Sequence, residues 1–156
     1  MPPLMDPDTA TRLARAISRL ARQLNASSTT VGLSPAQASV LGLLVARGPM
    51  NPTGLAEVEG INPTMLSRVV GKLETMGLVE RSADPDDQRS SLLEATASGR
   101  RADRRVKLER AQIVSRCLDA LEEHDVVTIG EALSPLERLA MELNQQTRRH
   151  LTGPRR

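Results

Sequence analysis

The sequence predicts a mainly α-helical protein with a small β-hairpin: a winged helix-turn-helix DNA-binding lobe joined to a helical dimerisation lobe built from the N- and C-terminal helices. Two observations predict this class. A capped amphipathic helix over residues 62–76 runs directly into two short strands joined by a charged loop, residues 83–90. Elsewhere, apolar residues recur at helical spacing along most of the chain.

The helix over residues 62–76 has local signals for its start and its end. Asn62 is a good N-cap, Pro63 fits the first helical position, and Gly77 follows the last periodic residue as a C-terminal cap. The apolar residues that should face the core are Leu66, Val69, Val70, Leu73 and Met76. The outer face then carries Thr64, Met65, Ser67, Arg68 and Lys72. Because this face is polar and partly basic, it suits the groove of duplex DNA, and with Asn62 it forms the candidate recognition helix.

A hairpin follows this helix. Residues 78–81 and 92–96 contain enough Leu, Val and Thr to form short strands. The sequence DPDD at residues 84–87 is typical of a turn. Spacing alone identifies this element only as a charged hairpin.

Three further helices are expected before the recognition helix. Apolar residues form a stripe after Asp8, in the first helix. Ser34 and the proline after it open a second helix that stops at Gly48, and Asn51 with its proline starts a short third helix that ends at Gly60. The chain is then one domain, residues 1–156, with a DNA-binding lobe over 34–97 and dimerisation helices over 8–30 and 98–150.

The C-terminal part should contain a long helix from Ser98 to about Glu123 and a last helical segment from Asp125, which Pro135 should kink or split. Apolar residues in the last segment alternate at spacings of three and four, as in helix-on-helix seams. Two arrangements are open: a two-fold dimer, or a bundle within one chain. The candidate dimer-interface residues are Leu13, Ile17, Val126, Ile129, Leu133, Leu136 and Leu143.

Composition limits the partners. The 156 residues include no Phe, Tyr or Trp, so the aromatic platforms on which single-stranded nucleic acids stack are absent. Duplex DNA needs no such platform. The net charge is only +2, but four arginines cluster at residues 100–105. They either contact phosphates or form a solvated helix face with pairs four residues apart.

Other chemistry has little support in the sequence. No apolar segment approaches the length of a membrane span and no signal peptide is recognised, so a cytoplasmic protein is expected. Cys117 lies in a helical apolar pattern and is expected to be a small buried hydrophobe, although a redox sensor is an alternative. His124 and His150 are expected to be solvated, and the loop aspartates to form the turn. We expect no metal, no cofactor and no enzymatic activity.

Residues 66–89, LSRVVGKLETMGLVERSADPDDQR, resemble the MarR family of bacterial winged-helix transcriptional regulators, and the likeness extends over nearly the whole chain. The most specific parts are the helix, the Gly-Leu-Val-x-Arg that follows it, and the wing motif at Asp87 to Arg89. The resemblance implies that Arg89 enters the minor groove, that Asp87 orients it, and that Ser67 and Arg68 read bases. Ser90 adjoins the motif and is a further candidate contact.

The resemblance also implies how such a protein acts. It predicts a repressor that binds a pseudo-palindromic operator as a homodimer and is released by a small-molecule effector between the two lobes. Since this chain has no aromatic side chain, an effector would be held by aliphatic, Met and Arg contacts. The alternative is a winged-helix scaffold that binds proteins without reading DNA.

Overall fold

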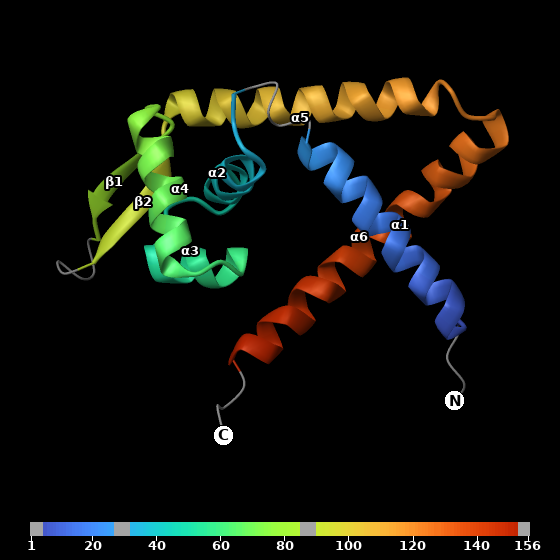
Figure 1. The fold of residues 1–156 in the computed structure, drawn as a ribbon, viewed down its shortest axis with the longest axis horizontal. Helices are drawn as coiled ribbons and strands as arrows, with labels where there is room; N and C mark the ends of the chain where they lie inside the picture. The colour runs from blue at the N-terminus through green and yellow to red at the C-terminus, as the bar shows by residue number, and fades with distance from the viewer. Residues whose placement is uncertain (1–4, 27–31, 85–89, 153–156) are drawn as a thin grey trace.

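The computed structural model describes residues 5–26, 32–84 and 90–152. A long helix, α5 (Ala97–Leu118), extends along one edge of the molecule and joins its two parts (Figure 1). One part holds a compact lobe with the hairpin, and the other holds the first and last helices. The elements are α1 (Pro7–Ala26), α2 (Pro35–Arg47), α3 (Pro52–Glu59), α4 (Pro63–Thr75), β1 (Val79–Ala83), β2 (Ser91–Ala95), α5 (Ala97–Leu118) and α6 (Glu123–Thr152).

The caps predicted for the lobe's three helices are confirmed. At the start of α2, the Gln37 N–H donates to Ser34 Oγ (3.3 Å) and the Ser34 N–H donates to Gln37 Oε1 (2.7 Å), a reciprocal capping box. Asn51 Oδ1 accepts a 2.7 Å bond from the N–H of Gly54 at the start of α3. Each of the three helices has proline in its first turn. The caps depend on neighbouring residues alone, which is why the sequence predicts them well.

The hairpin is also confirmed, with its strand ends shifted by one or two residues. β1 and β2 pair antiparallel, from Val79 opposite Ala95 to Ala83 opposite Ser91. One pairing was not predicted: Met50, between α2 and α3, exchanges two backbone hydrogen bonds with Leu93 of β2 (3.0 and 2.8 Å). This bridge fastens the hairpin to the helical part of the lobe.

The core lies between α2, α4, the hairpin and the first half of α5. Its buried apolar side chains are all aliphatic, as the composition requires. The large side chains that are almost completely buried are Leu33, Val40, Leu41, Leu44, Leu55, Val70, Leu73 and Leu93. On α5 the buried residues all precede Lys107: Gly99, Ala102, Asp103 and Val106.

A close backbone contact joins the start of α5 to the end of α4. Thr96 Oγ1 accepts a bond from the Gly99 N–H (3.0 Å) and donates to the Gly77 carbonyl (2.7 Å). A Cβ added at Gly99 would overlap the Leu78 carbonyl oxygen and lie 3.1 Å from a Leu41 methyl group. Glycine is therefore required at this position by packing, not by its backbone angles.

We expect Gly99→Ala to lower the free energy of unfolding by about 1–3 kcal/mol, because α5 or β1 must shift to admit the methyl group. The matched control is Gly71→Ala on α4, where an added Cβ meets nothing within 4 Å. That change should raise stability by about 0.5–1 kcal/mol through helix propensity. Urea unfolding followed by circular dichroism measures both. Equal stabilities for the two variants would contradict the packing assigned to Gly99.

The first helix starts slightly earlier than predicted. Its N-cap is Asp6, whose Oδ1 accepts bonds from the N–H groups of Asp8 (3.1 Å) and Thr9 (2.9 Å). The Thr9 hydroxyl and N–H hold the pKa of the Asp6 carboxyl below its usual value. No residue of α1 is buried. α1 therefore adds nothing to the core of the lobe.

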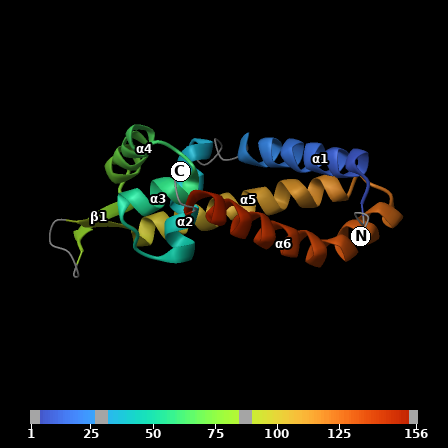
Figure 2. The same cartoon turned by 90° about the horizontal axis from the view of Figure 1, so that it is seen from below.

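The terminal helices do not form a bundle within the chain. Figure 2 shows α1 and α6 on opposite sides of α5. Their apolar stripes remain open: the exposed members include Ile17, Leu20, Ile129, Leu133, Leu136, Leu139, Met141 and Leu143. Of the two arrangements that the sequence permits, the intrachain bundle is wrong for the residues described.

Two expectations for α5 and α6 are corrected. The sequence predicts a kink or a split at Pro135, and the split is wrong, because α6 runs as one helix through that residue. Proline's fixed φ is compatible with a helix, so the chain continues past the lost hydrogen bond and the crowded carbonyl of the preceding turn. Cys117 is exposed and not buried. It lies in the second half of α5, beyond the core that covers Ala102 and Val106.

Candidate nucleic-acid interface

The outer face of α4 is presented to solvent. Four residues of this helix, Leu66, Val69, Val70 and Leu73, are buried on its inner side. The cap fixes the start of the helix, since the Met65 N–H donates to Asn62 Oδ1 at 2.8 Å. The predicted recognition residues are all exposed: Asn62, Thr64, Met65, Ser67, Arg68 and Lys72. Asn62 caps a helix of 13 residues, and the other five belong to that helix.

A groove of about 600 Å³ runs between this face and the start of α2. Its lining residues are Ser34, Ala36, Gln37, Asn62, Thr64, Met65, Arg68, Val69 and Lys72. Two of these carry positive charges, and no acidic side chain of the residues that the structure describes lines the groove. Arg68 and Lys72 lie three and seven residues after Met65, so the three follow one side of α4.

Both helices bordering the groove begin there, at Ser34 and Asn62. The N-terminus of a helix carries partial positive charge and free N–H groups. Together with the two side-chain cations, these ends make the groove suitable for an anionic surface such as a nucleic-acid backbone. The residues from α2 were not among the predicted site residues.

The base of the wing is fixed, and its tip lies outside the described residues. The Asp84 N–H donates to the Ser90 carbonyl at 3.2 Å, closing the hairpin where the strands end. Ser90 is half-buried. Asp87 and Arg89 fall within residues 85–89, so their roles stay predictions.

Arg81 connects the hairpin to the recognition helix, which the sequence did not reveal. Its Nε lies 3.3 Å from Glu74 Oε1 near the end of α4, and its Nη1 donates to Ser91 Oγ on β2 at 3.0 Å. Since Arg81 and Glu74 are partly exposed, the pair adds at most about 1 kcal/mol of stability. Its geometric effect is to tie α4 to both strands.

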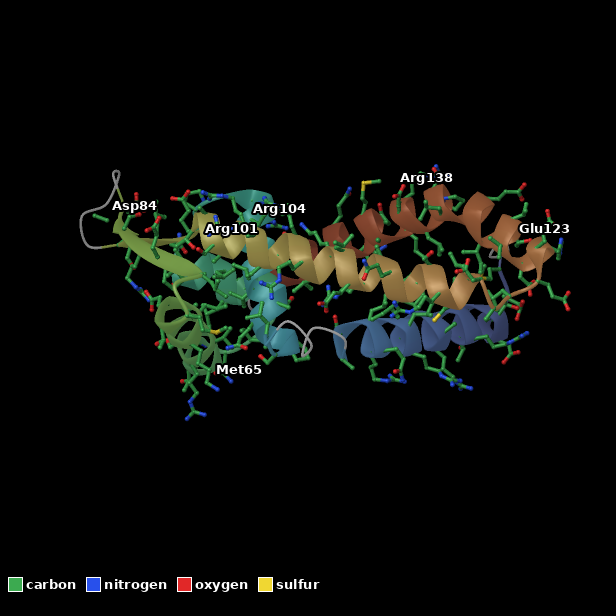
Figure 3. All side chains as sticks on the ribbon, turned by 90° about the horizontal axis from the view of Figure 1, so that it is seen from above. Met65, Asp84, Arg101, Arg104, Glu123 and Arg138 are labelled. Atoms are coloured by element: carbon green, nitrogen blue, oxygen red, sulfur yellow. The ribbon has the colours of Figure 1, made fainter. Side chains whose placement is uncertain are left out.

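Two of the arginines at the start of α5 donate hydrogen bonds to neighbouring residues. Arg100 Nη1 donates to the Ala95 carbonyl (2.6 Å), and Arg101 Nη2 donates to Ser98 Oγ (2.7 Å). In Figure 3, Arg101 and Arg104 lie on the opposite side of the lobe from Met65. The structure therefore does not bring these two arginines together with the exposed face of α4.

An ion pair within α5 joins an exposed lysine of the basic run to a buried aspartate. Lys107 Nζ lies 2.7 Å from Asp103 Oδ2, one helical turn away, in an approach that falls outside hydrogen-bond geometry. Asp103 itself is buried against α2, with Oδ1 close to Gly42. Its burial was not expected, because a charged residue inside a basic run resembles a surface residue.

The dimer-interface candidates lie on the open faces of the terminal helices. Leu13 and Val126 are half-buried, whereas the others are exposed: Ile17, Ile129, Leu133, Leu136 and Leu143. His124 is exposed at the start of α6. Among the side chains that the structure describes, no cluster of His, Cys, Asp or Glu could hold a metal ion. No helix in the described ranges is both long and apolar enough to span a bilayer.

Comparison with known proteins identifies the fold and the family. The MarR family model matches residues 33–91, from the start of α2 to the wing. An HTH-type transcriptional regulator of Mycobacterium leprae is 37% identical over 98 residues, which cover 62% of this chain and 68% of that protein. A regulator from Mycobacterium bovis is 36% identical over 98 residues, which cover 62% of this chain and 68% of that protein.

Solved structures agree with this assignment. MarR of Escherichia coli superposes with a TM-score of 0.70 at 21% identity, covering 86% of this chain and 98% of that one. A cysteine-to-serine mutant of the same protein, complexed with operator DNA, superposes with a TM-score of 0.59 at 21% identity. The match covers 83% of this chain and 94% of that one. CouR from Rhodococcus jostii, bound to p-coumaroyl-CoA, superposes with a TM-score of 0.61 at 27% identity. The match covers 83% of this chain and 92% of that one.

The matches agree on both architecture and class. The structures share the helical fold with its two-stranded hairpin, and the sequence relatives are transcriptional regulators and not enzymes. The chain belongs to the MarR family of winged helix-turn-helix transcriptional regulators.

Proposed function

We propose that the protein is a repressor that binds a pseudo-palindromic operator in duplex DNA as a homodimer, with α4 of each copy in the major groove. The observation that carries this proposal is the exposed face of α4, where Arg68 and Lys72 line a groove without acidic side chains. A protein-binding scaffold would not need these cations on one side of one helix.

The chemistry of that face favours a duplex. An α-helix fits the major groove, where Arg reads guanine through two hydrogen bonds and Ser or Thr can contact any base. Arg68 and Ser67 are the candidates for these contacts. The absence of Phe, Tyr and Trp removes the usual platform for single-stranded substrates.

The open apolar faces of α1 and α6 support the homodimer. Large contiguous apolar surfaces are rare on monomeric proteins and mark places where another molecule packs. A second copy can cover these faces, and the two-fold symmetry of such a dimer matches an inverted repeat. We propose that the interface includes Leu13, Ile17, Val126, Ile129, Leu133, Leu136 and Leu143.

We further propose that a small molecule releases the repressor from DNA in the cytoplasm. The support is the structural likeness to CouR, which binds p-coumaroyl-CoA. In this chain the ligand would be held by aliphatic, Met and Arg side chains, because the sequence contains no Phe, Tyr or Trp.

A gel-shift titration tests the proposal. The probe is the duplex that flanks the protein's own gene, and the control is a shuffled duplex of the same composition. We expect the probe to bind at least about 1000-fold more tightly, as specific sites generally do. Equal affinity for the two duplexes, or none for either, would refute sequence-specific binding and favour the scaffold.

Arg89→Ala tests the wing. We expect this variant to weaken binding to all duplexes by a similar factor and to reduce the salt slope by about one unit, since one phosphate-region cation is lost. Titrations at several salt concentrations measure the slope. Wild-type affinity together with an unchanged slope would remove Arg89 from the DNA contacts.

A further inference from the structure

Met65 is the one large, exposed apolar side chain among the predicted recognition residues, the others being polar or charged. It is 45% exposed, although methionine usually lies in a core. It lines the groove together with Arg68, which follows it by one helical turn. Figure 3 shows Met65 on the side of the lobe opposite Arg101 and Arg104.

The fold does not need this side chain. The cap at the start of α4 uses the backbone N–H of residue 65, which any residue except proline supplies. The neighbouring Leu66 and Val69 supply the buried contacts of this turn. The exposed thioether is thus available for a contact outside the chain.

The major groove offers one apolar group for such a contact. Among the four bases, only thymine presents a methyl group there, while the remaining edge groups are hydrogen-bond donors and acceptors. A flexible, polarizable thioether packs readily against a methyl group. Ala36 and Val69, which line the same groove, add apolar surface beside Met65.

We infer that Met65 selects a thymine in each operator half-site, next to the base pair that Arg68 reads. The inference rests on the proposed DNA-binding function. Three helical residues advance about 4.5 Å along α4, and successive bases are about 3.4 Å apart, so side chains one turn apart reach neighbouring base pairs. Met65 therefore specifies a T·A pair through the methyl group alone.

Replacing thymine by uracil in the operator removes this methyl group and leaves base pairing unchanged. The probe is a duplex enriched by the full chain from a random pool, and each thymine is replaced in turn. For the wild-type protein we expect the dissociation constant to rise about four-fold at one thymine per half-site, the effect of one buried methyl group. Met65→Ala should bind the thymine and uracil duplexes equally at that position.

Met76→Ala is the matched control. Met76 is also 45% exposed, but it lies at the other end of α4 and does not line the groove. This variant should keep the four-fold preference for thymine. Circular dichroism checks that both variants retain the wild-type helix content.

The outcomes separate the inference from the function on which it rests. If the wild-type protein enriches no duplex, the proposed function and this inference both fail. If it binds an enriched duplex but no uracil substitution weakens binding, Met65 does not read thymine, while the proposed function stands. A four-fold effect that persists in Met65→Ala also overturns the inference, because another residue then contacts the methyl group.

Discussion

Leu136→Asp should convert the proposed dimer into a folded monomer and weaken operator binding by at least about 100-fold, the largest effect that we expect from any single change. Leu136 lies on the open apolar face of α6 and is 39% exposed in the single chain. In a dimer it would be covered, and an unpaired carboxylate in such an interface costs several kcal/mol. Leu136 is far from α4 in the sequence, so the substitution leaves the exposed face of α4 unchanged.

Light scattering and a gel shift on the same variant measure this prediction. Val58→Asp is the matched control for the oligomeric state, because Val58 is 38% exposed and lies on α3, outside the terminal helices. It should remain a dimer. If Leu136→Asp is a folded monomer and still binds the full operator as tightly as the wild type, DNA binding does not require the dimer.

Arg68→Ala should lose about 1–3 kcal/mol of discrimination at one base pair in each half-site. The physical reason is the loss of a guanidinium that can donate two hydrogen bonds to guanine, while the rest of α4 keeps its place. Competition among operators carrying each of the four base pairs at that position measures the change in preference.

Arg104→Ala is the control for charge alone, because Arg104 lies on the opposite side of the lobe from Met65 (Figure 3). It should keep the wild-type preference at every position. If the Arg68 and Arg104 variants weaken binding equally and neither changes the base preference, Arg68 contributes only charge.

The parts of the fold that depend on neighbouring residues could be predicted from the sequence. Ser34, Asn51 and Asn62 cap helices through bonds that span three residues, so their signals lie within a few positions of each other. The amphipathic period of α4 likewise predicts the four side chains that this helix buries, whereas Met76, which was predicted to face the core, is 45% exposed where the helix ends. The candidate recognition face could therefore be identified from the order of residues alone.

The contacts that join distant segments could not be predicted. The bridge between Met50 and Leu93 and the approach of Gly99 to Leu78 depend on how the hairpin and α5 fold back on the lobe. The same holds for the part of the groove that α2 contributes. Cys117 was predicted to be buried but is exposed. An apolar pattern along a helix indicates a face that can pack against another surface, but it does not show whether the same chain supplies that surface.

The symmetry of the DNA sequence recovered by the protein tests the central claim most directly, namely that two copies of α4 read one duplex. Selection from a random pool followed by sequencing gives this result without assuming any operator sequence. We expect an inverted repeat whose half-site centres are separated by about 10 base pairs or a multiple of that spacing, one α4 for each half-site. A single asymmetric site, or a pool without enrichment, would contradict the account.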